Sequence, residues 1–143
     1  MEAIVSLGGK RRPLTFVAQV AYYYELRTGR VFLADVMQLL NQMANAEEAI
    51  ASGRVEDGLK AVSNVLFADI AYEGLCYAAR KRGEAFDAEP ADVHAWLYGD
   101  AEAIKEVVTL LVNSLPRADN GAAEGDEKKI TGSSRALRRG GKR

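Results

Sequence analysis

The sequence has very few of the side chains from which disulfides and metal sites are built. Its 143 residues include one cysteine, Cys76, and one histidine, His94. A single cysteine excludes a disulfide within the chain. One cysteine and one histidine are also too few for a zinc site unless carboxylates complete it, and no spacing indicates this. We therefore expect no disulfide, no bound metal and no cofactor.

Long apolar runs are missing as well. Charged residues interrupt every apolar stretch well before the roughly 18 residues that a membrane-spanning helix needs. The first residues also lack the charged segment and the apolar run of a signal peptide. The expectation is a protein of the cytoplasm with no membrane partner.

Charge divides the sequence into two parts. Residues 1–116 contain 11 Lys and Arg against 16 Asp and Glu, whereas residues 117–143 contain 8 against 4. The second part has only Ile130 and Leu137 as large apolar side chains. Such a composition cannot bury enough apolar surface to offset the entropy lost on ordering. We predict one folded acidic domain, residues 1–116, and a disordered basic tail, residues 117–143.

Within the folded part, residues 2–16 predict a β-hairpin. Apolar side chains alternate along residues 3–7, and Gly8 and Gly9 allow the positive φ of a tight turn. Pro13 has no N–H to donate, so we expect the returning strand to have a free edge there. Because two strands alone are marginally stable in water, the hairpin must pack on other elements.

The remaining pattern predicts a mostly α fold of the α+β class, with the hairpin packed on a small bundle of about five helices. Apolar residues recur at helical spacing, and glycines follow several helices. Thr15 is expected to cap the first helix, Asp87 or Glu89 the helix before Gly99, and Asp100 the last helix. A glycine inside the longest helix, Gly74, indicates a close crossing of two helices. The expected helices lie between Thr15 and Gly29, at 32–43, at 55–82, between Glu89 and Gly99, and at 100–115, with a short helix and a turn within 45–58.

The segment EPADVHAWLYGD, residues 89–100, places the one histidine and the one tryptophan between carboxylates. Val93, Trp96 and Leu97 have the spacing of one helical face, so Trp96 is predicted to be buried against the last helix. His94 falls at the edge of that face and is expected to be a surface residue without a catalytic role. The segment therefore predicts a short packing helix.

No other pattern indicates catalysis. Cys76 lies in an apolar helical run, which favours a buried structural thiol. The sequence has no nucleophile elbow and no glycine-rich nucleotide loop. Paired carboxylates favour helix starts, where the dipole attracts them; the pairs are Glu47–Glu48, Glu56–Asp57 and Glu89–Asp92. We expect the protein not to be an enzyme.

Two groups of residues are candidates for partner binding. Consecutive helical residues point about 100° apart, so Tyr22, Tyr23 and Tyr24 cannot all face the core. Tyr24 is expected in the core, and Tyr23 either there or at the surface with Tyr22. Tyr22 and Tyr23 are the candidate anchors, and simple packing with the hydroxyl at the surface is the alternative. In the tail, the basic residues around RALRRGGKR can bind an acidic surface or phosphate, or can simply keep the chain soluble; the candidates are Arg135, Arg138 and Arg139.

The order of these elements resembles the tail assembly chaperones of long-tailed, siphovirus-type bacteriophages. The resemblance covers residues 2–116 and rests on the hairpin, on YYYELRTG at 22–29, on NVLFADIAYEGLCYAARKRGE at 64–84, and on DAEPADVHAWLYGDAEAIKEVVTLLVNSLP at 87–116. It implies a protein that binds the tape-measure protein, keeps its apolar helices soluble and helps to recruit tail-tube subunits. The family supplies no catalytic residue, and its members are absent from the finished virion.

Two alternative functions stay open, and self-association is a further kind of partner binding. The chain can instead be a small connector or structural protein of a virion, since size and helix content fit both. It can also be a nucleic-acid-binding regulator that uses its basic tail. That function needs a basic recognition helix, and the helices expected at 55–82 and 100–115 are not basic along one face, so nucleic acid is not an expected partner. Self-association is the further partner.

Overall fold

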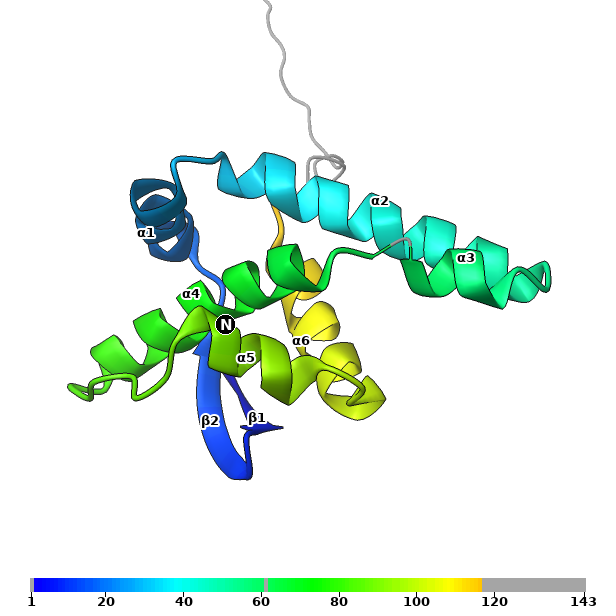
Figure 1. Cartoon of the computed structure of the whole chain (residues 1–143). Coiled ribbons are helices and arrows are strands. Elements are labelled where there is room, and N and C mark those ends of the chain that lie inside the picture. Colours follow the sequence, from blue (N-terminus) through cyan, green and yellow to red (C-terminus); the bar gives the residue numbers. More distant parts are fainter. Residues whose placement is uncertain (1, 61, 117–143) are drawn as a thin grey trace, which may run out of the picture.

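A β-hairpin followed by six helices makes up the described residues, 2–60 and 62–116, of this computed structural model (Figure 1). The mostly helical α+β fold predicted from the sequence is therefore confirmed. The predicted disordered tail, residues 117–143, lies outside the described residues. The candidate binding residues Arg135, Arg138 and Arg139 belong to it. The elements are β1 Glu2–Leu7, β2 Lys10–Thr15, α1 Ala18–Thr28, α2 Phe32–Ala51, α3 Val55–Lys60, α4 Asn64–Lys81, α5 Pro90–Leu97 and α6 Ala101–Ser114.

The hairpin forms as its alternating pattern predicts. β1 and β2 pair antiparallel with Leu7 opposite Lys10, and a two-residue turn joins them at Gly8 and Gly9, with φ of 62° and 78°. Val5 and Leu7 are buried, whereas Ile4, on the opposite face, is exposed. One face of the hairpin is thus available for packing against the helices.

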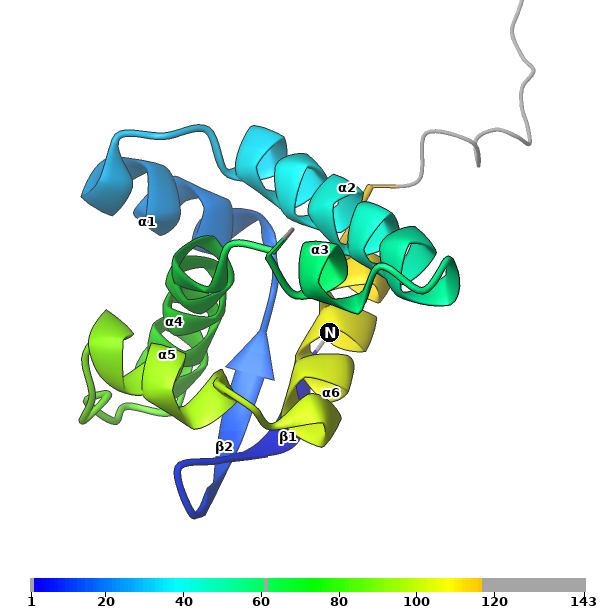
Figure 2. The same cartoon turned by 45° about the vertical axis from the view of Figure 1, so that its right-hand side comes forward.

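Two helices cover the hairpin. α4 packs on β2, and α6 packs against β1 (Figure 2). The close approach that Gly74 predicts is confirmed, but its partner is a strand and not a second helix. A Cβ atom at Gly74 would lie 2.8 Å from Leu14 Cδ1 and 2.8 Å from the carbonyl oxygen of Thr15. Glycine therefore lets α4 lie directly on β2.

The middle of the chain departs from the expected boundaries. α2 continues to Ala51, so that Glu47 and Glu48 lie within it rather than at a helix start. The helix expected at 55–82 is divided into α3 and α4. The hydroxyl of Ser63 caps α4 by accepting a hydrogen bond from the Leu66 N–H at 3.2 Å. This local bond begins a new helix where apolar periodicity alone suggested continuity.

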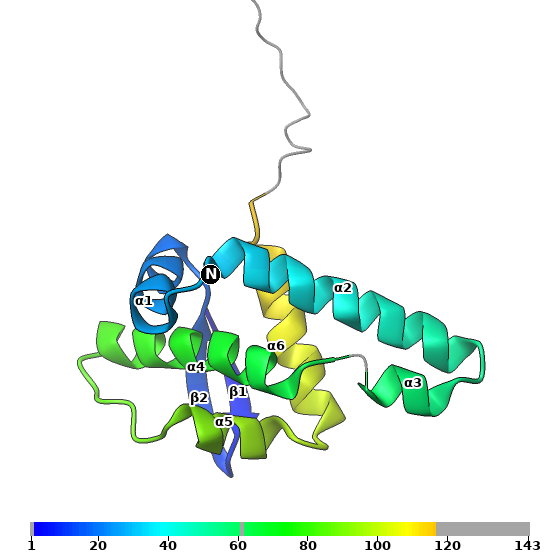
Figure 3. The same ribbon diagram turned by 45° about the horizontal axis from the view of Figure 1, so that its top comes forward.

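The α2–α3 pair forms an arm that extends beyond the other helices (Figure 3). Gly53, with φ of 85°, lies in the turn between the two helices. A Cβ atom at Gly58 would lie 2.9 Å from the carbonyl oxygen of Ala46 and 2.6 Å from Ile50 Cγ1. The glycine in α3 therefore permits its close contact with α2.

Of the two predicted ends of α1, the start differs from the prediction and the end agrees with it. Thr15 belongs to β2, and the N-cap of α1 is Val17, whose side chain makes no capping hydrogen bond. The expected cap at Thr15 is thus wrong, because the strand continues through that residue. Gly29 ends α1 with φ of 74°, as the sequence predicts.

The caps of the last two helices are confirmed. Glu89 and Asp92 form a reciprocal capping box at the start of α5, where Pro90 is the first helical residue. Asp100 caps α6 by accepting a hydrogen bond from the Ala103 N–H at 3.0 Å. These signals are local, so the sequence is sufficient to locate them.

Trp96 is not buried against the last helix, contrary to the prediction. It is half-buried and lies over the hairpin turn, where a Cβ atom at Gly8 would be 2.4 Å from the indole ring. The Arg12 guanidinium lies 4.1 Å from the centroid of the indole, and Phe86 meets it edge-on. Its neighbours Val93 and Leu97 provide the buried contacts of α5 instead.

Replacement of Gly74 tests the contact between α4 and β2. Alanine would strengthen a free helix by about 1 kcal/mol, but its methyl group meets a backbone carbonyl that cannot move without shifting β2. We expect Gly74→Ala to lower the free energy of unfolding by about 1–3 kcal/mol in urea denaturation. The exposed control Lys81→Ala should change it by less than about 0.5 kcal/mol. Equal or greater stability of Gly74→Ala would contradict this packing.

Candidate partner-binding site

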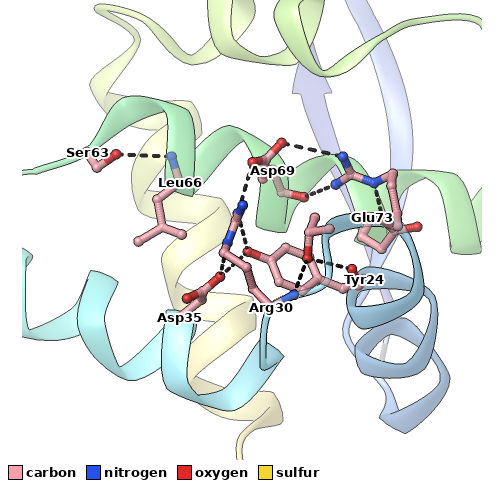
Figure 4. Close-up of polar contacts among 9 residues, drawn as sticks. Tyr24, Arg30, Asp35, Ser63, Leu66, Asp69 and Glu73 are labelled. Atoms are coloured by element: carbon pink, nitrogen blue, oxygen red, sulfur yellow. Dashed lines mark hydrogen bonds and ion pairs between the residues drawn. The ribbon is translucent and has the colours of Figure 1, made fainter.

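A buried cluster of polar side chains fixes the angle between α1 and α2. The Tyr24 hydroxyl donates a hydrogen bond to Asp35 Oδ2 at 2.5 Å, and Arg30 Nε donates to the same oxygen at 2.7 Å. Arg30 Nη2 also donates to the Tyr24 hydroxyl at 2.9 Å and to Asp69 Oδ2 at 3.1 Å (Figure 4). Residues of α1, α2 and α4 therefore meet around one guanidinium.

A second arginine joins α1 to α4 one turn away. Arg27 Nε donates a hydrogen bond at 2.7 Å to Glu73, whose side chain is buried. Its guanidinium also lies 4.8 Å from the centroid of the Tyr72 ring and donates to the carbonyl oxygen of Asp69 at 3.2 Å. Planar guanidinium groups suit such sites, since they bond carboxylates and stack on rings together.

The shifted pKa values of Tyr24, Asp35 and Arg30 keep these side chains in the protonation states that their hydrogen bonds need. Burial, and then the hydrogen bond to Asp35, raise the pKa of Tyr24 well above its ordinary value. Burial alone would raise the pKa of Asp35, but hydrogen bonds from Tyr24 and Arg30 outweigh it, and the pKa is lowered. Hydrogen bonds to Asp35, Tyr24 and Asp69 raise the pKa of Arg30. At neutral pH the cluster therefore contains a neutral phenol, a carboxylate and a guanidinium.

An apolar groove opens where α1, α2 and the end of α6 meet. Its volume is about 410 Å³. The one charged side chain in its lining, Glu25, is held in place because it accepts a hydrogen bond from the Phe32 N–H at 2.9 Å. We call this hollow the α1–α2–α6 groove; its apolar lining includes Val17, Ala21, Phe32, Leu33, Leu111 and Leu115.

Apolar surface continues beyond the groove. Leu33, in its lining, is 47% exposed, and Met37, one turn further along α2, is 54% exposed. Val112, next to the lining residue Leu111, is 42% exposed. The main apolar stripe of the helix predicts its buried face and gives no indication of this surface. Leu33 and Met37 form a second apolar pair outside that stripe, and this pair is the available signal.

The tyrosines proposed as anchors lie outside the groove lining. Tyr24 is buried and Tyr22 is 63% exposed, as the helical geometry predicts. Tyr23 is half-buried, with the Arg80 guanidinium 4.4 Å from the centroid of its ring and Tyr77 nearby at 6.1 Å. A role of Tyr22 and Tyr23 in partner binding stays a prediction. Tyr22 is one helical turn from the lining residues Ala18 and Glu25, whereas Tyr23 is on a different face of α1 from the groove.

The residues considered for chemistry have packing contacts. His94 is half-buried and stacks on Tyr98, with ring centroids 6.0 Å apart. Cys76 is half-buried rather than buried, and burial raises the pKa of its thiol. A hydrogen bond with Cys76, followed by burial, raises the pKa of Tyr72 to about 12. Across residues 2–60 and 62–116, no three His, Cys, Asp or Glu side chains gather as metal ligands would.

Comparisons with known proteins give no relative from which a site could be transferred. No protein-family model, curated protein or solved structure matches the chain. In the part of the chain that the structure describes, no helix has the length and apolar character to cross a membrane. The groove is therefore assigned from its own geometry.

The hydroxyl of Tyr24 can be tested by its removal. Tyr24→Phe leaves the ring in place but deprives Asp35 and Arg30 of a buried hydrogen-bonding partner. We expect the free energy of unfolding to fall by about 1–3 kcal/mol in urea denaturation. Tyr22→Phe is the matched control, two residues away and exposed, and should change stability by less than about 0.5 kcal/mol. Equal effects of the two changes would show that the cluster does not stabilise the fold.

Acid titration tests the lowered pKa of Asp35. A carboxylate whose pKa is lower in the folded state contributes stability above its unfolded pKa of about 3.9, and this is lost as pH falls through the folded pKa. We expect the unfolding free energy to decrease below about pH 5, and less steeply in Asp35→Asn. Asp87, also lowered in pKa, is on the surface, so Asp87→Asn should change the slope less. Identical acid profiles for the wild type and Asp35→Asn would contradict the assignment.

Proposed function

We propose that this protein is a bacteriophage tail assembly chaperone. It would hold the tape-measure protein soluble before assembly and help to recruit tail-tube subunits. Two observations support the proposal: the resemblance in the sequence of residues 2–116, and a preformed apolar groove on the surface of the folded part. The groove is the observation that carries the binding role, because it offers apolar surface that no described element covers.

The groove fits one face of a partner helix. Helical peptides bind apolar grooves through side chains at positions i, i+3, i+4 and i+7. Phe32 and Leu33 on α2 form one wall, and the other is formed by Leu111 on α6 and by Leu115, directly after that helix. A long unassembled helical protein exposes such faces along its whole length, and this surface aggregates unless it is covered.

The polar cluster keeps the groove ready to bind. Arg30 and Asp35 hold the start of α2 against α1 and α4, close to the lining residues Phe32 and Leu33. A preformed site loses less conformational entropy on binding than a site that must be ordered first. Individual contacts can still be weak, since many copies on one long partner gain avidity.

The charge distribution favours a protein partner over nucleic acid. Residues 1–116 contain 16 Asp and Glu against 11 Lys and Arg. Arg12, Arg27 and Arg30 are each paired with carboxylates of the same chain. These guanidinium groups are thus committed within the fold and do not support a phosphate-binding face.

A charge in the groove should abolish binding of the helical partner. The full chain is co-expressed with a candidate tape-measure protein, and the amounts of soluble partner and of co-purified complex are measured. We expect Leu33→Glu to weaken the complex at least about tenfold, because an apolar contact is lost and a carboxylate must be desolvated. Leu33 is 47% exposed, so the fold should tolerate the change.

Two matched variants locate the contact. Leu26→Glu introduces the same charge at a leucine of α1 that is 70% exposed and lies beside Tyr23. Val65→Glu does so on α4, at a residue that is 65% exposed. Both should bind as the wild type does. Loss of binding in Leu26→Glu alone would place the contact on the tyrosine face. A partner that is equally soluble without this chain would overturn the proposal.

A further inference from the structure

The outer edge of β1 has backbone groups without a strand to pair with. Leu7 and Lys10 flank a two-residue turn and exchange both hydrogen bonds, so the inward pairs continue at Val5 and Ala3. The N–H and C=O groups of Glu2, Ile4 and Ser6 consequently point away from β2. Within residues 2–60 and 62–116, the sheet contains only β1 and β2, and no backbone hydrogen bond from another element reaches Ile4 or Ser6.

The outer edge of β2 is protected in two ways. Pro13 sits opposite Ile4 in a pair without hydrogen bonds, so the N–H that it lacks is the one that would point outward. The loop after α4 also lies alongside this strand, held by Asp87, which accepts hydrogen bonds from Arg12 at 3.0 Å and from Lys10 at 3.3 Å. Proline, charge and a covering loop are the usual means of blocking an edge. β1 has neither a proline nor a covering loop among the described residues, and its one charged residue is Glu2, at the end of the strand.

A groove runs along the open edge. It has a volume of about 390 Å³ and lies between residues 3–5 of β1 and the polar face of α6. That face contains both signs of charge, since Glu102, Lys105 and Glu106 all line the groove. Across a two-fold axis the same surface faces itself, so Lys105 of one copy can approach Glu102 or Glu106 of the other.

We infer that β1 is a self-association surface, on which β1 of a second copy pairs antiparallel to form a four-stranded sheet. Ile4 lies opposite Ile4 of the second copy, and Glu2 lies opposite Ser6. In this register every outward N–H and C=O of residues 2, 4 and 6 is used, and each of these pairs exchanges two hydrogen bonds. A shift by two residues leaves one pair without a partner, so the backbone selects the register.

Charge favours the same register. Arg11 lies beside Ser6 in the hairpin, and its Nη1 donates to Ser6 Oγ at 3.4 Å. In the dimer, Glu2 of the second copy lies on the other side of Ser6, one strand spacing away. Each Arg11 therefore approaches a carboxylate of the other copy, and the two-fold axis repeats this contact. Within its own copy Glu2 already accepts a hydrogen bond from Arg82 at 2.8 Å, so in the dimer its carboxylate is shared between Arg82 and the second copy's Arg11. No like charges lie directly opposite each other, which is the arrangement that cross-strand pairing requires.

The interface is small, so the dimer is weak and reversible. A six-residue edge and one helix face bury less than a stable complex does, and we expect concentrations on the order of 100 µM to be needed to populate the dimer. The inference does not rest on the proposed chaperone function, because the α1–α2–α6 groove and the β1 edge have no lining residue in common.

Sedimentation equilibrium of the full chain tests the surface. Ile4→Pro removes the central outward N–H and no hydrogen bond of the hairpin, since Ile4 occupies the same kind of pair as Pro13. We expect a concentration-dependent dimer in the wild type and in the control Ile4→Val, and a monomer in Ile4→Pro with an unchanged circular dichroism spectrum. Arg11→Glu should raise the dissociation constant at least about tenfold. Arg82→Ala removes the other partner of Glu2 and should leave the dimer in place.

Three results would overturn the inference. One is a wild type that stays monomeric over the whole concentration range. Another is a dimer that persists in folded Ile4→Pro, or, if that variant does not fold, in Arg11→Glu, because the contact would then lie elsewhere. The third is a monomer whose Ile4 and Ser6 amides still exchange slowly with deuterium, because another segment would then occupy the edge.

Discussion

The fold depends on the need to pair one buried charge. The carboxylate of Asp35 lies in the first turn of α2, and an ionised group that is removed from water is stable only when other groups satisfy it. Tyr24 and Arg30 do so from α1 and from the α1–α2 loop, and Asp69 of α4 balances the guanidinium. Three helices are thereby held at fixed positions, and the apolar groove beside them is a consequence of that geometry.

A second arginine has the corresponding role at the hairpin. Arg12 is buried, donates to the Leu7 carbonyl at 2.9 Å and to Asp87 at 3.0 Å, and lies between the hairpin and the indole of Trp96. It links β2 to the loop before α5 and to α5 itself. Trp96 therefore covers the hairpin turn instead of filling the core. Its large ring also keeps water away from one side of the Arg12 guanidinium.

Both proposed binding surfaces arise because the layers of the fold are incomplete. Two strands cannot cover their own edges, and among the described residues β1 has no neighbouring strand on its outer side. Leu33 on α2 likewise has no helix above it, although it lies next to the buried Phe32. The apolar groove and the open edge bind different partners. The groove suits the apolar side chains of a helix, and the edge suits the backbone N–H and C=O groups of a strand.

The sequence by itself determined the features that depend on neighbouring residues. The Gly8–Gly9 turn, the end of α1 at Gly29, the capping box at Glu89 and the cap at Asp100 are set within a few residues, and all were predictable. The fold class was predictable for the same reason, because hydrophobic periodicity records which face of each element is buried.

Tertiary structure alone decided the features that join distant residues. Arg30 and Asp69 are 39 positions apart, and Arg12 and Asp87 are 75 apart, so no local pattern indicates that they meet. The break before α4 and the position of Trp96 were missed because periodicity identifies a buried face but not what covers it. The groove was missed for the same physical reason: a hollow is defined by the elements that are not there to fill it, and spacing along one helix contains no record of them.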